Sequence, residues 1–372
     1  YIYDKALNLD PLTFEQAFTL YNTAPTSQLS YIAHCIRMLK KPGNIVTWQI
    51  DRNINITNSC ISGCKFCNFH CRPSEHEKIF LTDIDEYSKK IGETLALGGD
   101  QILLQGGLHP DLDINYYETL FKELKRRFRA IKLHALGPPE IFHIARISGI
   151  TVTQTLSRLI DAGLESLPGA GAEILDNEVR KRISPAKCSA DQWLDVMRIA
   201  HRMGLATSAT MMYGHVETPK HRVQHLLKIR DLQNECPSGN YGFLAFIPWI
   251  FCSKGTALAS EMAKTDTTIT NTSDTTQQQF SSLEYLRIIA MSRILLNNID
   301  NIQTSWLTVG VPTAQLSLYG GANDMGSIMI EENVVSSAGA TNSLDAHAMR
   351  DVIIQAGFTP RLRDQKYNFR EL

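Results

Sequence analysis

The sequence lacks an apolar run long enough to cross a membrane, since none of its 372 residues lie in a stretch of 18 apolar residues. The longest apolar segment, 243–251, is short and is interrupted by Pro248. The N-terminus lacks a basic region followed by an apolar run, so no signal peptide is expected, and the chain does not begin with Met. These absences predict a cytoplasmic protein that does not associate with membranes.

The sequence also lacks an excess of charge of either sign. It has 37 basic and 38 acidic residues, which produce no field to attract nucleic acid or an anionic membrane surface. With 43% apolar residues, the chain can bury a large core. We therefore expect a globular protein that does not bind nucleic acid or an anionic membrane.

The eight cysteines do not have the spacing of a disulfide framework. Cys60, Cys64, Cys67 and Cys71 lie within twelve residues, and the other four are scattered along the chain. One tight cluster in a large, intracellular-looking chain indicates metal ligation rather than disulfides. The scattered cysteines are expected to be small buried apolar residues.

Apolar periodicity predicts alternating strands and helices. Residues 11–41 have helical spacing, and 44–56 form an extended segment that leads directly into the cysteine cluster. Further strands are expected at 101–105, 131–135, 164–167, 206–212, 242–247 and 302–307, and an eighth near 327–330. Helices are expected at 115–128, 152–162, 190–203, 219–234 and 282–297. Such alternation implies a parallel sheet.

Eight strand–helix units predict an α/β fold with a (β/α)8 TIM-barrel-like core, whose site lies at the carboxyl ends of the strands. We expect the barrel domain at 42–335, an N-terminal helical extension at 1–41 and a C-terminal helical extension at 336–372. The segment 264–279 is rich in Thr, Asn, Asp and Gln and is expected to be an exposed, mobile loop.

The cysteine cluster has the spacing C-x3-C-x2-C, formed by Cys60, Cys64 and Cys67. Thiolates bind iron well, and four of them usually hold an iron–sulfur cluster. Three ligands on a four-iron cluster leave one iron open. That iron can bind the amino and carboxylate groups of S-adenosylmethionine (SAM) and pass it an electron.

Two other interpretations of the cluster remain open from spacing alone. The three cysteines with His70 or Cys71 would also satisfy a structural zinc ion. The four cysteines can also have come together by chance. The position after a predicted barrel strand favours the iron–sulfur cluster, because zinc ribbons are small modules with two ligand pairs. His70 and Cys71 are then expected to be bystanders.

With these motifs, the chain resembles the radical SAM superfamily, and within it the branch of menaquinone-pathway and deazaflavin-pathway enzymes. The shared strings are QGGLHPD at 105–111, HALGPPE at 134–140 and GAGAEI at 169–174. The later strings FIPW at 246–249, WLTVG at 306–310, QLSL at 315–318, GANDMGS at 321–327 and EEN at 331–333 are similar to those of members of the futalosine pathway that cyclise dehypoxanthine futalosine. The resemblance covers most of residues 40–365.

The resemblance implies a [4Fe–4S] cluster and SAM as cofactors. Phe66, Gln105, Gly106 and Gly107 are expected to contact SAM, because glycine lets the backbone come close to a ligand. An ordinary strand-to-loop turn is the alternative for the two glycines. Glu173 is expected to accept hydrogen bonds from the ribose hydroxyls of SAM, although an acid in the first turn of a helix would also be favoured by the helix dipole.

His109, His134 and Tyr213 are the candidates for a general base. Each histidine follows or lies within a predicted strand and can bind substrate, move a proton or simply be a satisfied core residue. The resemblance implies that SAM-derived 5′-deoxyadenosyl radical removes hydrogen from ribose C4′ of dehypoxanthine futalosine, and that the carbon radical then adds to the benzoate ring. It also implies an electron donor such as flavodoxin or ferredoxin.

Three other functions remain open at this point. An enzyme like aminodeoxyfutalosine synthase would incorporate the adenosyl group into its product. An electron-transfer iron–sulfur protein would contain the cluster without cleaving SAM. A zinc-binding structural protein would contain no iron.

Overall fold

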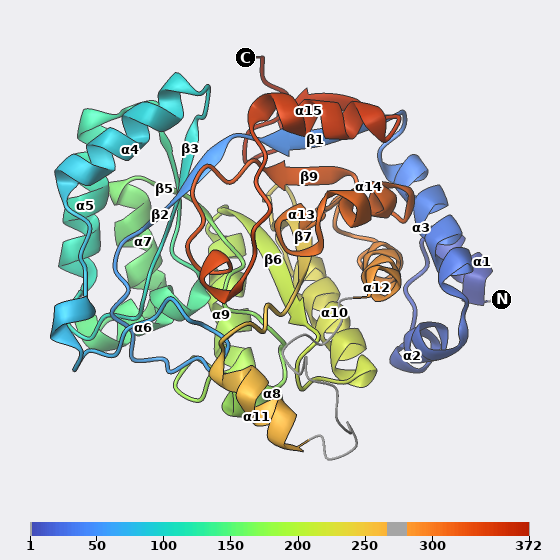
Figure 1. Ribbon diagram of the computed structural model, residues 1–372, viewed down its shortest axis with the longest axis horizontal. Coiled ribbons are helices and arrows are strands. Elements are labelled where there is room, and N and C mark those ends of the chain that lie inside the picture. Colours follow the sequence, from blue (N-terminus) through green and yellow to red (C-terminus); the bar gives the residue numbers. More distant parts are fainter. Residues whose placement is uncertain (1, 266–280, 372) are drawn as a thin grey trace.

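The computed structural model describes residues 2–265 and 281–371. Its centre is a curled sheet of seven parallel strands that follow one another in the order of the chain (Figure 1). The strands are β2 (Asp51–Asn55), β3 (Gln101–Gln105), β4 (Lys132–Ala135), β5 (Leu164–Leu167), β6 (Ala206–Tyr213), β7 (Phe243–Ile250) and β8 (Asn301–Ile302). The predicted parallel α/β architecture is thereby confirmed.

A second sheet of three parallel strands completes the ring. It contains β1 (Ile45–Gln49), β9 (Asp324–Ser327) and β10 (Thr359–Leu362), in the order β10-β1-β9. Only Ile50 separates β1 from β2, so one extended segment belongs to both sheets. A bridge between Gln303 and Asp324 places β9 beside the end of β8. The eighth strand of the barrel is therefore β9, three residues before the position expected from sequence.

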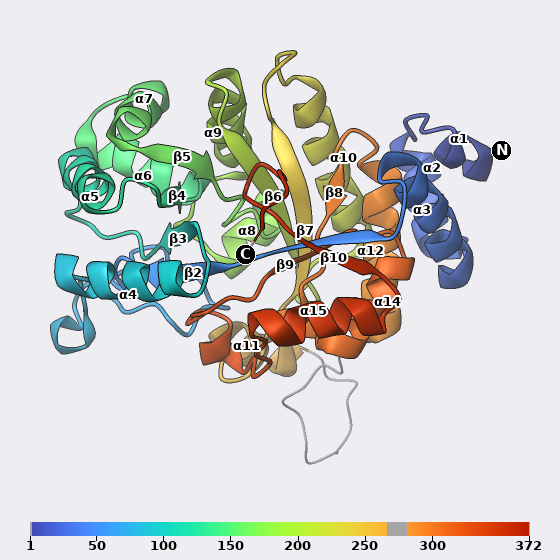
Figure 2. The ribbon, with the colours of Figure 1, turned by 90° about the horizontal axis from the view of Figure 1, so that it is seen from above.

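Helices between the strands cover the outer face of the curled sheet (Figure 2). They are α4 (Ile84–Ala96), α5 (Ile114–Arg127), α6 (Pro138–Ser148), α7 (Val152–Ala162), α9 (Ala190–Arg202), α10 (Pro219–Asn234) and α12 (Ser282–Leu295). Two further helices, α8 (Asn177–Ile183) and α11 (Ala257–Thr265), lie against the cysteine loop, where the Lys65 backbone bonds to Ile183 and Leu258. Local sequence sets several of their starts. Thr151 and Ser189 form capping boxes with Gln154 and Gln192, and Ser281 accepts a hydrogen bond from the Glu284 amide.

The N-terminal region forms α1 (Ile2–Leu7), α2 (Phe14–Thr23) and α3 (Thr26–Lys40). These helices pack beside α12, as Figure 1 shows at its right edge. The Tyr21 hydroxyl donates to Glu284 Oε1 at 2.7 Å, and Arg230 donates to the Leu12 carbonyl at 2.8 Å. One continuous hydrophobic core includes residues of these helices and of the barrel.

The segment after β8 differs from the sequence prediction. The expected strand at 302–307 was wrong beyond Ile302, where β8 ends. Gln303 forms only an isolated bridge, and α13 (Trp306–Val309) begins three residues later. The Thr304 amide still bonds to the Asp324 carbonyl, but Trp306 turns inward and donates from Nε1 to the Ser327 carbonyl at 3.0 Å. Burial of that indole ends the extended segment early. Helix α14 (Val311–Tyr319) follows.

The C-terminal segment 336–372 contains helix α15 (Ala346–Gln355), as expected, but also strand β10, which the sequence reading missed. The expected Thr-rich loop at 264–279 lies outside the described residues except for Lys264 and Thr265, which end α11. Among the described residues, no helix is long and apolar enough to cross a membrane.

Candidate active site

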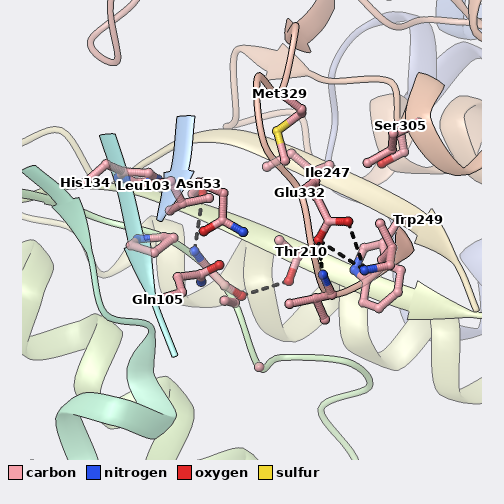
Figure 3. Close-up of a pocket in the computed structure, with 18 of the residues that line it drawn as sticks. Asn53, Leu103, Gln105, His134, Thr210, Ile247, Trp249, Ser305, Met329 and Glu332 are labelled. Atoms are coloured by element: carbon pink, nitrogen blue, oxygen red, sulfur yellow. Dashed lines mark hydrogen bonds between the residues drawn. The ribbon is translucent and has the colours of Figure 1, made fainter. Parts of the chain in front are cut away.

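The carboxyl ends of the strands surround one cavity of about 420 Å³. The cysteine loop follows β2, the Gly106–Gly107 turn follows β3, and the segment 169–173 follows β5. In Figure 3, Asn53, Gln105 and His134 from neighbouring strands line one side of this cavity, opposite Trp249 and Glu332. The sequence-predicted cofactor residues therefore meet where the barrel architecture places a site.

The three cysteines of the motif line the cavity together. Cys60 and Cys64 are buried, and Cys67 is partly buried. Burial raises the pKa of the Cys64 thiol to about 11 and also raises that of Cys67. Because only thiolates bind metal, burial keeps Cys64 and Cys67 protonated until a metal replaces their protons.

The donor set suits an iron–sulfur cluster. The Leu108 amide donates to Cys60 Sγ at 3.2 Å, and the backbone amides of Phe69 and His70 donate to the Cys67 sulfur. Across the described residues, no three His, Cys, Asp or Glu side chains converge tightly enough to hold a single ion. A four-iron cluster makes no such demand, because each of its ligands binds a different iron. Cys60, Cys64 and Cys67 would hold the cluster, and three cysteine ligands would leave one iron free for SAM.

Cys71 and His70 have different surroundings. The Cys71 thiol lies 3.6 Å from the Glu75 carbonyl and does not line the cavity. His70 does line the cavity, and its Nδ1 contacts the Cys67 carbonyl at 2.7 Å.

The Gly106–Gly107 turn packs directly on the cysteine loop. A Cβ atom on Gly107 would lie 2.1 Å from the Ser59 carbonyl oxygen, well inside contact distance. The Gly107 amide donates to the Thr57 carbonyl at 2.8 Å. Glycine is thus required here because two backbone segments touch. Gln105 and both glycines line the cavity, as a role in SAM binding requires.

Glu173 is buried at the cavity wall and pairs with Lys187, whose Nζ lies 2.8 Å from Glu173 Oε1. Lys187 also sits over the Phe66 ring, 5.2 Å from its centroid. Glu173 adopts a φ of 44°, a left-handed conformation that costs energy for a residue with a Cβ. Sequence reasoning missed Lys187, which lies 14 residues from its partner and in no recognised string.

Glu140 is a second acid that sequence reasoning left without a role. Its carboxylate accepts hydrogen bonds from the Gly106 and Gly137 amides and lines the cavity. Burial raises its pKa to about 7, although these amides and Lys187 act in the opposite direction. Glu140 ends the string HALGPPE at 134–140. Its position shortly after β4 is the signal that could have marked it as a site residue.

The wall of the cavity formed by β2, β3 and β4 carries polar side chains. Asn53, Leu103 and His134 stand in register on three adjacent strands. The His134 Nδ1 contacts Ser166 Oγ at 2.7 Å, and burial lowers the pKa of His134 to about 3, so the ring is neutral. Asp51, another residue not foreseen, lines the cavity, and burial raises its pKa.

Two of the three candidate bases lie away from this cavity. His109 is on the loop after the glycines, where its Nδ1 accepts from the Asp111 amide at 3.1 Å. Tyr213 is 1% exposed at the end of β6 and packs under Arg222, whose guanidinium lies 5.1 Å from the ring centroid. His134 is the candidate that lines the cavity, so the structure brings it together with the cofactor residues and leaves the other two outside.

Two family models match the chain over successive segments. The model of the radical SAM superfamily matches residues 54–229, and that of the CofH/MqnC C-terminal region matches residues 240–372. Cyclic dehypoxanthine futalosine synthase from Streptomyces coelicolor is 41% identical over 368 residues, which are 98% of this chain and 87% of the relative. The chain belongs to the radical SAM superfamily. Within the superfamily it belongs to the CofH/MqnC type.

Two further relatives carry names of different activities. The synthase of the same name from Halalkalibacterium halodurans is 38% identical over 98% of this chain and 93% of that protein. A 5-amino-6-(D-ribitylamino)uracil–L-tyrosine 4-hydroxyphenyl transferase from Archaeoglobus fulgidus is 40% identical over 88% of this chain and 89% of that protein.

Solved structures agree on the fold. Methylornithine synthase (PylB) superposes with a TM-score of 0.68 over 98% of both chains, at 18% identity. The hydrogenase maturase HydG from Carboxydothermus hydrogenoformans superposes with a TM-score of 0.72 over 98% of this chain and 80% of that chain, at 14% identity. At these identities the likenesses concern the fold alone.

Membership of the family establishes the general chemistry. The protein is a radical SAM enzyme of the futalosine-pathway family that uses a [4Fe–4S] cluster and SAM and acts on a small molecule. The electron-transfer and zinc-binding alternatives are set aside accordingly. Family membership does not identify the particular reaction, because relatives named for two different activities have similar sequence identity to this chain, 41% and 40%.

Proposed function

We propose that this enzyme cyclises dehypoxanthine futalosine to cyclic dehypoxanthine futalosine, a step of menaquinone synthesis. The support is the likeness to two synthases of that name over 98% of the chain. The observation that carries the proposal in this chain is the continuity of one cavity from the three cysteines to the barrel interior. A substrate in the interior would then lie against SAM bound at the rim.

The cofactors, when bound, supply a 5′-deoxyadenosyl radical that removes a hydrogen atom from ribose C4′ of the substrate. The chain supplies binding, orientation and exclusion of water. Cys60, Cys64 and Cys67 would hold the cluster. Gln105, Gly106, Gly107 and Phe66 would flank SAM, and Glu173 would accept from its ribose hydroxyls.

Glu140 and Lys187 line the cavity beside these proposed cofactor-binding residues. We assign the Glu140 carboxylate to a cationic group of SAM, because it is a buried acid bonded to the Gly106 amide and no basic side chain of the described residues is bonded to it. Lys187 holds Glu173 in its strained conformation through their 2.8 Å ion pair.

The interior residues would orient the substrate. His134 is neutral and buried, so it suits hydrogen bonding to substrate better than carrying a charge. Cyclisation would join C4′ to the benzoate ring, and the ring would regain aromaticity by losing a proton to the chain and one electron to the oxidised cluster. Asp51 suits the proton, because burial raises its pKa and its Oδ1 has no hydrogen-bond partner among the described residues. A one-electron donor such as flavodoxin or ferredoxin would reduce the cluster.

The test is anaerobic turnover of the reconstituted full chain with SAM, dithionite and dehypoxanthine futalosine. We expect 5′-deoxyadenosine and a product lighter than the substrate by two hydrogen atoms. Cys64→Ala should abolish both and lower the iron content. A product that contains the adenosyl group would identify a reaction like that of aminodeoxyfutalosine synthase and overturn the proposal.

The tyrosine-dependent transferases provide the second candidate function, favoured by the 40% identity of the Archaeoglobus relative. Turnover with L-tyrosine and 5-amino-6-(D-ribitylamino)uracil in place of the nucleoside tests it directly. Formation of an adduct of these two substrates, with no reaction of dehypoxanthine futalosine, would replace the main proposal with this one.

A further inference from the structure

Ser62 occupies the middle of the first cysteine spacing and points toward the proposed cluster ligands. Its Oγ lies 2.9 Å from Cys60 Sγ and 3.2 Å from Cys64 Sγ. The side chain is 3% exposed, so water does not compete for the hydroxyl. One oxygen therefore joins two sulfurs of the motif inside a dry pocket.

The backbone after Ser62 makes this contact possible. Gly63 has a φ of +61°, a left-handed conformation, and a Cβ there would meet no atom within 4 Å. Glycine is thus favoured for its conformation rather than for space. The turn reverses the chain between Cys60 and Cys64, which leaves the Ser62 side chain between the two thiols.

Within the described part of the chain, the other hydrogen bonds to the sulfurs of Cys60 and Cys67 come from the main chain. The Leu108 amide donates to Cys60, and the Phe69 and His70 amides donate to Cys67. Backbone donors persist whatever side chains occupy their positions. The Ser62 hydroxyl is a side-chain donor, so a single substitution can remove it without removing a main-chain bond.

We propose that Ser62 is a positioning residue that donates a hydrogen bond to a cluster thiolate and thereby raises the reduction potential of the cluster. The proposal rests on the assignment of Cys60 and Cys64 as cluster ligands. Reduction adds one electron from an external donor and breaks no bond. The added negative charge is shared with the sulfurs, so a hydrogen bond to sulfur stabilises the reduced state more than the oxidised state.

A purely structural role for Ser62 predicts something different. If the hydroxyl only shaped the loop, its loss would lower the amount of bound iron and leave the potential of the loaded protein unchanged. The potential is therefore the measurement that separates the two roles.

The experiment compares the anaerobically reconstituted wild-type chain with Ser62→Ala, Ser62→Thr and Ser59→Ala. Ser59 is the matched control, because it lies in the same loop, is 1% exposed and has a hydroxyl with no hydrogen-bond partner among the described residues. The midpoint potential of the cluster is measured by redox titration followed by electron paramagnetic resonance. Iron per chain is measured on the same samples.

We expect Ser62→Ala to shift the potential to a more negative value and Ser62→Thr to keep it near the wild-type value. Ser59→Ala should also match the wild type. With dithionite, Ser62→Ala should form 5′-deoxyadenosine more slowly, and a stronger reductant such as titanium(III) citrate should restore the rate. If Ser62→Thr fails to take up iron, the difference between the two alanine variants decides the question.

An unchanged potential in iron-loaded Ser62→Ala would overturn the inference, and so would an equal shift in Ser59→Ala. If Cys60 and Cys64 are not cluster ligands, Cys64→Ala will instead retain a full cluster. The iron content of Cys64→Ala therefore separates a wrong ligand assignment from a wrong inference about Ser62.

Discussion

At the scale of single residues, the buried pair of Glu173 and Lys187 has the sharpest consequence. Glu173→Gln removes a charged acceptor next to the proposed ribose site. A hydrogen bond to a charged group contributes about 1.5–3 kcal/mol, so we expect the KM for SAM to rise roughly 10- to 100-fold. Steady-state formation of 5′-deoxyadenosine at varied SAM measures this change.

The matched control for Glu173→Gln is Glu165→Gln. Glu165 also pairs with a lysine, Lys125 at 2.7 Å, but it is 38% exposed and does not line the cavity. Its substitution should leave the KM for SAM unchanged. An equal rise in the KM for SAM in both variants would show that breaking any such ion pair has this effect. Glu173 would then no longer be assigned to the SAM site.

Glu140 predicts a pH dependence of stability in the cofactor-free chain. Burial raises its pKa from the ordinary 4.5 to about 7, so the folded state binds a proton that the unfolded state releases. The stability that this proton contributes is fully present below pH 4.5 and is lost as the pH rises through about 7. The full effect is on the order of 3 kcal/mol.

Thermal unfolding of the wild type and Glu140→Gln between pH 5 and pH 8 measures this loss. The wild type should lose more stability than the variant over that window, since glutamine cannot ionise. Glu178→Gln, which removes an acid that is 84% exposed, should follow the wild-type profile. Parallel profiles for the wild type and Glu140→Gln would contradict the prediction.

At the scale of elements, the contact between the β3 turn and the cysteine loop is sensitive to one atom. Gly107→Ala places a Cβ 2.1 Å from the Ser59 carbonyl, and relief requires the two segments to separate. Overpacking of this kind costs about 1–3 kcal/mol. We expect a lower unfolding temperature and less iron per chain after reconstitution.

Gly92→Ala is the matched control for the glycine substitution. Gly92 lies within α4, and a Cβ there would meet no atom within 4 Å. Replacing glycine by alanine inside a helix stabilises by about 0.5–1 kcal/mol, so this variant should unfold slightly later and bind iron normally. Normal iron binding in Gly107→Ala would show that the β3 turn does not position the cysteine loop.

Local patterns predicted most individual elements correctly, and the exceptions share a cause. Helix α7 and strand β3 occur at the predicted residues, because helical apolar spacing and a short apolar run that ends in glycines are local signals. Strand β8 is shorter than predicted because the Trp306 indole turns inward to the Ser327 carbonyl. Strand β10 pairs only with β1, more than 300 residues away, so no local signal revealed it.

At the scale of the whole molecule, closure of the ring depends on a buried ion pair. Arg363, just after β10, donates to both oxygens of Asp324 in β9, at 2.6 and 3.0 Å, and to Gln49 Oε1 in β1 at 2.6 Å. Arg363→Ala leaves the Asp324 carboxylate buried without its cation. We expect a loss of about 3–5 kcal/mol in the free energy of unfolding.

Denaturant unfolding of the cofactor-free chain measures the Arg363 effect. Arg361→Ala is the control, because that arginine lies two residues earlier on the same strand with its side chain exposed. It should change the free energy of unfolding by no more than about 0.5 kcal/mol. A loss for Arg363→Ala no larger than for Arg361→Ala would show that the ion pair does not hold the sheets together.

The sequence by itself determined the kind of chemistry and the fold class. The spacing of Cys60, Cys64 and Cys67, with its position after a predicted strand and the later recognised strings, favours an open-iron cluster over zinc. Strand–helix alternation predicts a parallel barrel. These signals all lie among neighbouring residues. Only the tertiary structure decided what surrounds the cluster. Lys187, Glu140 and Asp51 reach the cavity from separate elements, while His109 and Tyr213 stay outside it. Which side chains share a cavity depends on strand register and long-range burial, and a linear pattern does not contain these.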